Sequence, residues 1–356
     1  MVLTMNKAKQ SACISVIIPT RNEEEYIMEC LSSLQNCKSI SSNLFKVEFI
    51  IVDGMSSDNT VKIVNEKFSH LNLKILENPK LFQANAMNIG IKNSSYLKED
   101  SIIIRADAHS KYPKDYIYKC WQSSINARGG NTGSIQKAVG INFFTNIIAD
   151  VMNSGYAMGG VSYRKINKNS ADQSPQYIDT DTAYLGCWKA SDLIKLDGFN
   201  EEFQINEDYE LNIRLRKNRK KVFVVSNLIV EYYVRSSLRG LIKQFFRYGL
   251  WKTKTISVHK DSLKLRQLAP VIFILFLITL GVSNLILPTQ ILLILNYIYS
   301  VIGIAWVSII ILIWFKSSSI FSIFWIPLIV LSMHISWGLG FLYGLLRWMT
   351  GGWNKS

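Results

Sequence analysis

The sequence predicts an α/β domain with a mostly parallel, doubly wound sheet, followed by C-terminal transmembrane helices. Two observations carry this prediction. In the first part of the chain, short β-branched runs alternate with helical patterns, which is typical of parallel sheets. In the last part, residues 268–346 contain a single charged residue, Lys316, and long apolar stretches of this kind span bilayers.

The first hundred residues are expected to form four strands and the helices between them. Strands are expected at 14–18, 49–52, 73–76 and 101–105, and helices at 24–34, 58–68 and 83–91, the second capped by Asp58. Ligands of such sheets bind beyond the carboxyl ends of the strands. Glu23, Asp53 and Asp107 all follow strand ends, so we expect a ligand at this edge.

The middle of the chain is less regular. Residues 129–176 are expected to be loops, with Gly-rich stretches at 129–130 and 159–160 and a polar stretch at 165–174. A strand is then expected at 180–188, where Gly186 permits a close approach of another group. A short helix (191–196), a turn at Asp197–Gly198, a strand at 222–225 and an extended segment at 228–234 complete the domain.

An acidic helix is expected to begin at Asn206, Glu207 and Asp208. Asn206 is a good N-cap residue, and acids in a first helical turn are stabilising by themselves. Adjacent helical residues lie about 100° apart, so one carboxylate can face a cleft while the other serves the helix end. The sequence of this helix alone favours the structural interpretation.

The apolar C-terminal part contains three candidate membrane spans, at 268–287, 291–315 and 320–346, the third interrupted by Pro327. Residues 1–10 lack the apolar core of a signal peptide, so we expect the N-terminal domain in the cytosol. We divide the chain into an α/β domain (1–234), a basic interfacial segment (235–267), a membrane domain (268–346) and a tail (347–356).

The formal charge of +14 is concentrated before the first span. Basic residues of this kind remain on the cytoplasmic side and attract anionic lipid headgroups. The amphipathic stretch 239–254 therefore predicts an interfacial helix, and membrane lipids are a better partner than nucleic acid. The five scattered cysteines suggest neither a disulfide framework nor a zinc site.

Several side chains could carry chemistry, although each also has a structural interpretation. Asp53 could accept hydrogen bonds from a nucleobase or ribose, or simply form a turn. Asp107 and His109 offer oxygen and nitrogen ligands that suit Mn²⁺ at least as well as Mg²⁺. The alternative is that they belong to a polar loop without a metal. Glu207 or Asp208 could be a general base, and Arg247 could bind phosphate or a lipid headgroup.

The order of these motifs resembles the family 2 glycosyltransferases, which have the GT-A fold, over roughly residues 11–254. The matching segments are 16–23 (VIIPTRNE), 51–60 (IVDGMSSDNT), 85–91 (NAMNIGI), 105–110 (RADAHS), 206–208 (NED) and 244–248 (QFFRY). Together with 179–188 (DTDTAYLGCW), they are most similar to the succinoglycan-biosynthesis (ExoA-like) branch of the family. His109 stands where the family's D-x-D motif has its second acid, and Tyr248 stands where its Q-x-x-R-W motif has Trp.

The resemblance implies the role of each candidate residue. Asp208 is expected to be the catalytic base of an inverting transfer. The nucleotide-sugar donor, expected to be a UDP-sugar, is assigned to Pro19, Thr20, Arg21, Glu23, Asp53, Arg105 and Asp107, and the divalent cation (Mn²⁺ or Mg²⁺) to Asp107 and His109. The acceptor and diphosphate are assigned to Gly186, Trp188, Glu207, Gln244, Arg247 and Tyr248.

The sequence thus predicts a membrane-bound glycosyltransferase of the inner membrane, with a cytosolic catalytic domain. Its expected acceptor is a polyprenyl-linked or growing glycan in exopolysaccharide or cell-surface glycan synthesis. Two alternatives remain open: a processive polysaccharide synthase, and a non-catalytic membrane-tethered scaffold that binds sugar nucleotides or lipids.

Overall fold

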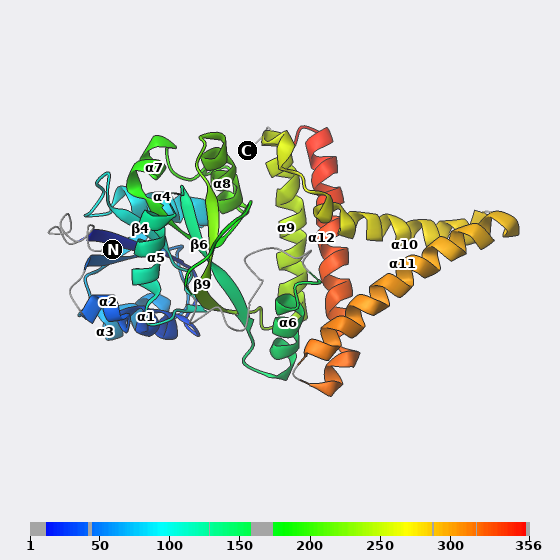
Figure 1. Cartoon of the computed structure of the whole chain (residues 1–356), viewed down its shortest axis with the longest axis horizontal. Coiled ribbons are helices and arrows are strands. Elements are labelled where there is room, and N and C mark those ends of the chain that lie inside the picture. Colours follow the sequence, from blue (N-terminus) through cyan, green and yellow to red (C-terminus); the bar gives the residue numbers. More distant parts are fainter. Residues whose placement is uncertain are drawn as a thin grey trace. The chain divides into compact units, whose positions relative to one another are not determined.

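The computed structural model describes residues 12–41, 45–127, 129–157, 174–286, 288–317 and 319–353. The chain divides into two compact units (Figure 1). The first comprises Met1–Lys137 with Lys165–Tyr232, and the second comprises Ala138–Arg164 with Tyr233–Ser356.

The first unit is built on one mixed sheet of nine described strands, in the order β3-β2-β1-β4-β8-β6-β9-β5, with β7 also paired to β9. The strands are β1 (Ala12–Thr20), β2 (Phe45–Asp53), β3 (Leu73–Glu77), β4 (Ile102–Arg105), β5 (Ser110–Lys111), β6 (Asn131–Val139), β7 (Tyr177–Asp179), β8 (Tyr184–Lys189) and β9 (Val222–Tyr233). The half from β3 to β4 is parallel, and the pairs from β8 onward are antiparallel.

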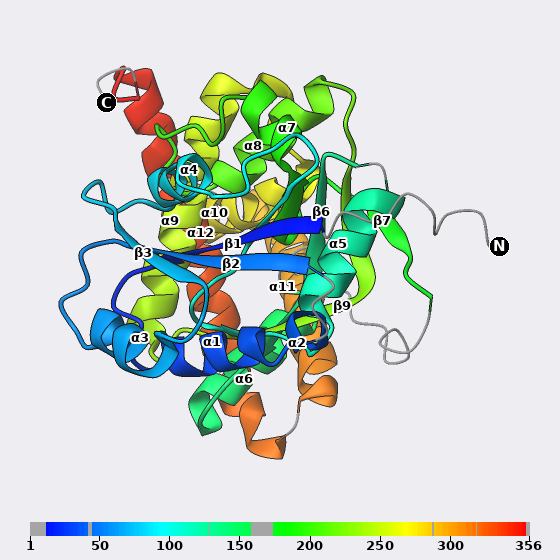
Figure 2. The same cartoon turned by 90° about the vertical axis from the view of Figure 1, so that its left-hand side faces the viewer.

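Helices cover both faces of the parallel half. Helices α1 (Ile27–Gln35) and α3 (Thr60–Phe68) lie on one face, and α4 (Gln83–Lys92), α7 (Ala190–Lys195) and α8 (Glu207–Lys217) lie on the other (Figures 1 and 2). The short α2 (Lys38–Ser41) and α5 (Tyr116–Asn126) complete the unit. The core between the sheet and α4, α7 and α8 is formed by side chains such as Ile17, Ile50, Met87, Trp188 and Leu211. The expected α/β architecture is confirmed.

Several predictions at the level of elements are wrong. Residues 129–157 are not a loop region but contain β6 and the helix α6 (Phe143–Asn153). Asn142 starts α6 with a capping box, because its side chain accepts from Thr145 N while the Thr145 hydroxyl binds Asn142 N. The two segments at 222–225 and 228–234 form the single strand β9, and β8 begins only at Tyr184. The predicted loops at 159–160 and 165–173 lie outside the described residues.

One of two predicted helix starts also differs from expectation. Asn206 stands at the N-cap of α8, but it has a left-handed backbone (φ 65°) and its side chain makes no capping hydrogen bond. At α3, Asp58 acts as expected, because its Oδ1 accepts from Thr60 N at 3.0 Å. A contact of Glu207 with Arg105 of the sheet, which is described below, ties the first residue of α8 to the sheet.

The second unit consists of helices. They are α6, α9 (Leu238–Val258), η3 (Lys260–Ser262), η4 (Leu265–Leu268), α10 (Ala269–Ile286), α11 (Thr289–Lys316), η5 (Ile320–Phe324) and α12 (Ile326–Met349). Three of the described segments are long and apolar enough to cross a membrane: Leu265–Ser283, Ile291–Lys316 and Ile326–Met349. The sequence predicted that Pro327 interrupts the third segment. Instead, Pro327 stands in the first turn of α12, where proline fits a helix.

All five cysteines are free thiols, and four of them are buried.

Candidate active site

The carboxyl ends of β1, β2 and β4 form one edge of the parallel sheet. Thr20 and Asp53 are register partners at the ends of β1 and β2, and Gly54 N donates to Thr20 O at 2.7 Å. Pro19 is the penultimate residue of β1 and pairs with Val52. The predicted edge therefore carries the expected side chains.

The loops after β1 and β2 are joined by hydrogen bonds between their motif residues. Asn22 Oδ1 accepts from Ser57 N at 2.8 Å, and Glu23 N donates to the Thr60 hydroxyl at 2.8 Å. The Arg21 side chain is exposed and lies over Gly54, where a Cβ would be 3.3 Å from Arg21 Cδ. The two motifs thus build one rigid rim at the sheet edge.

Asp53 is buried and its carboxylate is engaged in its own turn. Oδ2 accepts from Ser56 N at 2.9 Å, and Oδ1 accepts from the Ser56 hydroxyl at 2.5 Å. This is the turn-forming arrangement that Asp commonly adopts. Its remaining acceptor capacity is what a nucleotide could use.

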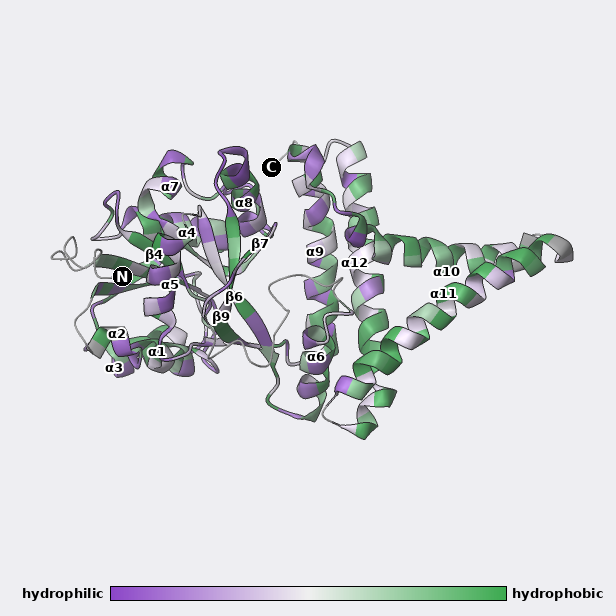
Figure 3. Cartoon of the chain, in the orientation of Figure 1, coloured by the Kyte–Doolittle hydropathy of each residue, from purple (hydrophilic) through white to green (hydrophobic). Residues whose placement is uncertain are grey.

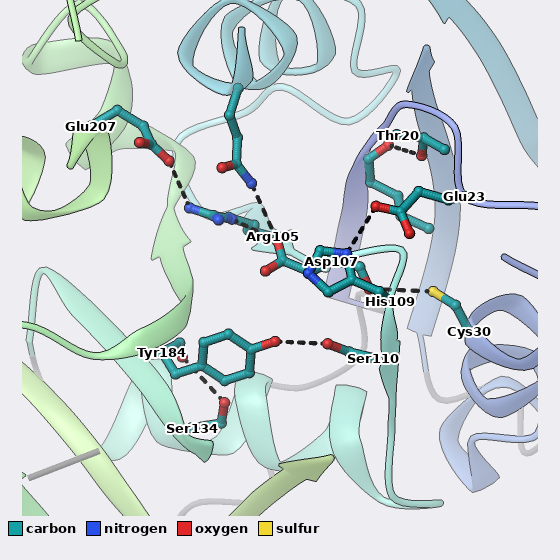
Figure 4. A network of polar contacts seen from close by, with 12 residues as sticks. Thr20, Glu23, Cys30, Arg105, Asp107, His109, Ser110, Ser134, Tyr184 and Glu207 are labelled. Atoms are coloured by element: carbon teal, nitrogen blue, oxygen red, sulfur yellow. Dashed lines mark hydrogen bonds and ion pairs between the residues drawn. The ribbon is translucent and has the colours of Figure 1, made fainter. Parts of the chain in front are cut away.

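A buried arginine connects the acids of two distant segments (Figure 4). Arg105, the last residue of β4, donates from Nε to Asp107 Oδ1 and from Nη1 to Glu207 Oε1, each at 3.1 Å. All three side chains are nearly inaccessible to solvent. Gln83 Nε2 also donates to Asp107 Oδ1, at 3.3 Å. Helix α8 is thereby tied to the sheet through its first residue.

The charges of this cluster set its acid–base behaviour. Burial and the neighbouring Asp208 raise the pKa of Glu207 to about 7, against the lowering effect of Arg105. Burial also raises the pKa of Asp208, against the lowering effect of Arg105 and of the Tyr209 N–H. Burial alone would lower the pKa of Arg105, but Asp107, Glu207 and Asp208 raise it above its ordinary value. The arginine therefore remains charged.

Glu207 and Asp208 are not equivalent. Glu207 is only 4 % exposed and faces Arg105, whereas Asp208 is partly exposed and its Oδ1 accepts from Tyr209 N at 2.7 Å. Glu207 does not serve the helix end, whereas Asp208 accepts from a backbone N–H of the first turn, as the structural interpretation of the acidic pair expects. Of the two, Asp208 is the one accessible to a second molecule.

A second contact joins the loop after β1 to the loop after β4. His109 Nδ1 lies 2.9 Å from Glu23 Oε1, and the imidazole ring packs edge-on against Tyr232, with centroids 5.3 Å apart. Next to it, the Ser110 and Tyr184 hydroxyls lie 2.7 Å apart (Figure 4). The peptide of Asp107 is held by Tyr112, whose hydroxyl oxygen accepts from Asp107 N at 2.7 Å. The loop with Asp107 and His109 is thus supported on several sides.

Gly186 and Trp188 occupy β8 beside this cluster. Gly186 is the register partner of Arg105, and the group that approaches it closely is the ring of Trp188, which a Cβ at Gly186 would overlap. The Trp188 side chain is 1 % exposed and packs edge-on against Phe199 in the core. A side chain so deeply buried fits a packing role.

Gln244, Arg247 and Tyr248 belong to α9 in the second unit. Gln244 Nε2 donates to the Tyr248 hydroxyl at 2.9 Å, as residues four apart on a helix can. Arg247 is half-buried, and burial together with the nearby charge of Arg235 lowers its pKa.

The sequence reasoning missed the contacts that hold the segment before α8. Asn88 of α4 donates to Phe199 O and accepts from Phe199 N, each at 2.8 Å. Glu201 in the same segment accepts from Lys80 at 2.7 Å and from Asn88 and Asn85. Both asparagines are buried, and their spacing of three residues places them on one face of α4. This spacing is the signal that could have revealed them.

The described residues contain no group of three or more His, Cys, Asp or Glu side chains arranged to hold a metal ion. Asp107 and His109 nevertheless lie on one loop, and both described bonds to the Asp107 carboxylate go to Oδ1. With two protein ligands at most, a divalent ion would need oxygen atoms from a bound phosphate and water to complete its shell, as Mg²⁺ sites commonly do.

Known proteins are similar to this chain in sequence and in fold. The model of the family described as "Glycosyl transferase family 2" matches residues 15–173. A dolichyl N-acetyl-α-D-glucosaminyl phosphate 3-β-D-2,3-diacetamido-2,3-dideoxy-β-D-glucuronosyltransferase from Methanococcus voltae is 28% identical over 285 residues, covering 77% of this chain and 83% of the relative. The succinoglycan biosynthesis protein ExoA of Rhizobium meliloti (strain 1021) is 27% identical over 260 residues, covering 72% of this chain and 73% of the relative.

A solved structure has the same fold. The mannosyltransferase PcManGT from Pyrobaculum calidifontis, in complex with GDP-Man and Mn²⁺, superposes with a TM-score of 0.62 and 16% identity, covering 96% of this chain and 88% of that chain. The predicted GT-A architecture with C-terminal apolar helices is confirmed. Family model, relatives and fold agree in identifying the chain as a glycosyltransferase that is similar in sequence to family 2.

Proposed function

We propose that this glycosyltransferase moves a sugar from a nucleotide diphosphate sugar to a polyprenyl-linked or growing glycan acceptor. The observation that carries the proposal is the buried Arg105, which joins Asp107 of the donor edge to Glu207 beside Asp208. One charged group thus couples the donor side of the site to the acid that would activate the acceptor.

The donor is assigned to the edge formed by β1, β2 and β4. Pro19, Thr20, Arg21, Glu23 and Asp53 would hold the nucleoside, and Arg105 and Asp107 the side of the diphosphate. A uridine base is our expectation, although PcManGT carries GDP-Man. Backbone and carboxylate groups at such an edge suit either base.

Asp107 and His109 would hold a divalent cation against the diphosphate. When Nδ1–H of His109 donates to Glu23, Nε2 is left with its lone pair for the metal, and Glu23 fixes the ring. Asp107 would offer Oδ2, since Arg105 and Gln83 both donate to Oδ1. The bound cation would offset the charge of the leaving diphosphate. PcManGT was solved with Mn²⁺, which supports Mn²⁺ over Mg²⁺.

Asp208 would act as the base. Its carboxylate takes the proton of the acceptor hydroxyl while that oxygen forms a bond to the anomeric carbon. The bond from this carbon to the diphosphate oxygen breaks, and the nucleotide diphosphate leaves with the electron pair, which inverts the anomeric centre. The pKa of Asp208, raised by burial, makes the carboxylate a better proton acceptor than an ordinary Asp.

The acceptor is assigned to Glu207 and Gly186 in the first unit and to Gln244, Arg247 and Tyr248 in α9. The buried position of Trp188 leads us to propose that it supports this side of the site without touching the acceptor. The Methanococcus voltae relative acts, by its name, on a dolichyl phosphate sugar, and the Rhizobium relative belongs to succinoglycan synthesis. The first supports a lipid-linked acceptor, and the second supports a role in exopolysaccharide synthesis.

The apolar helices support a place in the inner membrane, with the catalytic domain (1–234) in the cytosol, where nucleotide sugars are available. The basic segment 235–267 would lie at the headgroups, because Lys and Arg remain on the cytoplasmic side. Residues 268–346 would form the membrane domain and 347–356 a tail.

The variant Asp208→Asn tests the base. We expect transfer to fall by at least about 10²-fold, as for the loss of a general base, while nucleotide diphosphate affinity measured by calorimetry changes little. Full turnover in this variant would overturn the assignment.

A control variant makes the test specific, and a donor screen complements it. Asp192→Asn changes an acid that pairs with Lys220, away from the sheet edge, and should leave turnover intact.

A screen of UDP- and GDP-sugars for donor hydrolysis, with Mn²⁺, Mg²⁺ or EDTA, identifies the donor. Absence of hydrolysis or transfer with every donor would favour the non-catalytic scaffold.

A further inference from the structure

Helix α9 cannot cross the hydrocarbon core of a membrane. Its 21 residues include five basic side chains: Arg239, Lys243, Arg247, Lys252 and Lys254. A charged side chain is costly at the centre of a spanning helix. Near its end, Lys252 and Lys254 are buried and donate to backbone carbonyls of Ser262 and Trp353, at 2.9 and 3.2 Å. The helix must therefore lie outside the hydrocarbon core.

Helix α12 packs along α9 over much of its length, and the two helices run in the same direction (Figure 1). Three glycines allow the close approach. A Cβ at Gly249 would overlap the Trp337 carbonyl, one at Gly340 the Phe246 carbonyl, and one at Gly344 the Thr253 hydroxyl. Two parallel helices in such close contact share one depth in the membrane, so α12 follows α9.

Helix α10 begins beside the middle of α12. A Cβ at Gly338, about halfway along α12, would overlap the Pro270 carbonyl and Ile274 of the first turns of α10. The Phe273 and His334 rings are 6.0 Å apart. If α12 crossed the bilayer, this contact would place the start of α10, and Arg266 just before it, near the bilayer centre. The cost of a charge at that depth argues against such a crossing.

The first half of α12 and the end of α11 contact the segment around α6, which joins two strands of the sheet. His334 Nε2 lies 3.3 Å from Ala157 O. The Ser317 hydroxyl donates to Asp150 at 2.8 Å, and Lys316 Nζ lies 4.6 Å from the centre of the Tyr156 ring. With 11 residues, α6 is too short to span a bilayer. These contacts keep α12 at the same membrane surface as α6.

One face of α12 is apolar and exposed. Leu339, Tyr343 and Leu346 are spaced by four and three residues and are 47, 54 and 60 % exposed, whereas Gly340, Phe341 and Gly344 between them are buried. In the hydropathy colouring, α9 beside α12 carries both hydrophilic and hydrophobic residues, whereas α10 and α11, which extend from α12, are mostly hydrophobic (Figure 3). Such a face suits a helix that lies in the interface plane.

We infer that α12 lies in the plane of the membrane beside α9, with its exposed apolar face against lipid, and that only the α10–α11 hairpin crosses the bilayer. If all three candidate segments crossed the bilayer, the two ends of the membrane region would lie on opposite sides. With two spans, the C-terminus lies on the side of α9. The inference rests on the membrane association proposed above.

Single-cysteine labelling tests the sidedness. The chain has no cysteine after Cys187, and Cys13, the one native thiol that is not buried, can be changed to Ser. In this background, Ser356→Cys reports the C-terminus, Lys260→Cys the side of α9, and Thr289→Cys the turn between α10 and α11. Oriented vesicles are treated with a membrane-impermeant maleimide.

We expect the cysteines at 356 and 260 to react in the same vesicles and the cysteine at 289 to react in vesicles of opposite orientation. A cysteine at 356 that reacts together with the one at 289 would overturn the inference. Carbonate extraction separates this outcome from failure of the premise, because a protein released from vesicles would contradict membrane insertion itself.

A measurement of depth distinguishes an in-plane helix from one that enters the bilayer and returns. A fluorophore is attached at Leu339→Cys on α12 or at Ile304→Cys, an exposed position near the middle of α11. Nitroxide lipids then quench it from the headgroup or from deep in the acyl chains. We expect shallow quenching at 339 and deep quenching at 304, in variants that retain donor hydrolysis. Deep quenching at both positions would overturn the inference.

Discussion

A single guanidinium determines the electrostatics of the candidate active site. Arg105 is surrounded by Asp107, Glu207 and Asp208, so the cluster carries more acid than base. Buried like charges raise one another's pKa and burial adds to the effect, which is why Glu207 is shifted furthest, to about 7. The site therefore takes up a proton near neutral pH as a unit.

The shifted pKa of Glu207 predicts a pH dependence of stability. A carboxyl with a folded-state pKa above its unfolded value stabilises the fold while protonated, and this contribution is lost as the pH rises from about 4.5 to about 7. Glu207→Gln cannot ionise, so the decline over this range should be smaller by roughly 1–3 kcal/mol. Thermal unfolding in detergent between pH 4.5 and 8 measures it.

The control for this experiment is Glu66→Gln, which changes an exposed carboxylate of α3 and should keep the slope of the unmodified protein. An unchanged slope in Glu207→Gln would show that Glu207 is not the group that titrates.

The pairing of Glu23 with His109 predicts a graded effect on metal affinity. His109→Ala removes a proposed ligand, and Glu23→Gln keeps a hydrogen bond but weakens the orientation of the ring. Loss of such outer partners costs about 10–100-fold in metal affinity, so we expect the Glu23 variant to lie between the unmodified protein and His109→Ala. Binding of Mn²⁺ measured by electron paramagnetic resonance, with nucleotide diphosphate present, gives the order directly. Equal affinity in all three proteins would remove His109 from the metal site.

At the scale of elements, the position of α8 depends on the turn before it. Asp197 and Gly198 both have positive φ, and a Cβ at Gly198 would lie 2.5 Å from Asn88 Oδ1. Asn88 makes two hydrogen bonds to the backbone of Phe199. The side chain of α4 thus fixes where the acidic helix begins.

Asn88→Ala should therefore misplace the acids without touching the donor edge. Loss of two buried hydrogen bonds costs roughly 2–5 kcal/mol, and we expect kcat to fall while the KM for the donor changes little. The matched control is Asn93→Ala at the end of the same helix, where an exposed side chain bonds only its own helix. Steady-state kinetics with both variants provides the check. A rise of the donor KM at constant kcat would contradict a positioning role of Asn88.

The sequence predicted most elements of the parallel half because hydrophobic periodicity and strand-end acids are local signals. Asp53 and Asp107 follow from their own strands, and a parallel register brings them to one edge. The contact between Arg105 and Glu207 joins residues 102 positions apart, and nothing local specifies it. Helix α6 could have been found, since Asn142 and Thr145 form a capping box before an apolar run.

At the scale of the whole molecule, hydropathy identified the apolar helices but not which of them cross the bilayer. The composition of α12 resembles a span, and only its glycine contacts with α9 show that it has a helical partner along one face. Hydropathy treats a face that packs on a helix and a face that meets lipid alike. The number of crossings therefore follows from packing and not from composition.

The hairpin of α10 and α11 also bears on whether the enzyme polymerises through a channel. Within the described residues, both helices expose mainly apolar side chains, such as Ile272, Ile278, Leu293 and Ile304, as lipid-facing helices do. A pore for a glycan needs a polar lining, which two such helices cannot enclose. We therefore expect one sugar per acceptor and not a polymer.

Mass spectrometry of a polyprenyl-linked acceptor incubated with excess donor measures the product. A single added sugar mass is expected even at long times, because the product must leave the site and has no channel to enter. Asp208→Asn sets the background without transfer. A ladder of products that lengthens with time, and persists when acceptor is in large excess, would show that the enzyme keeps its product, and the processive synthase would replace single transfer as its activity.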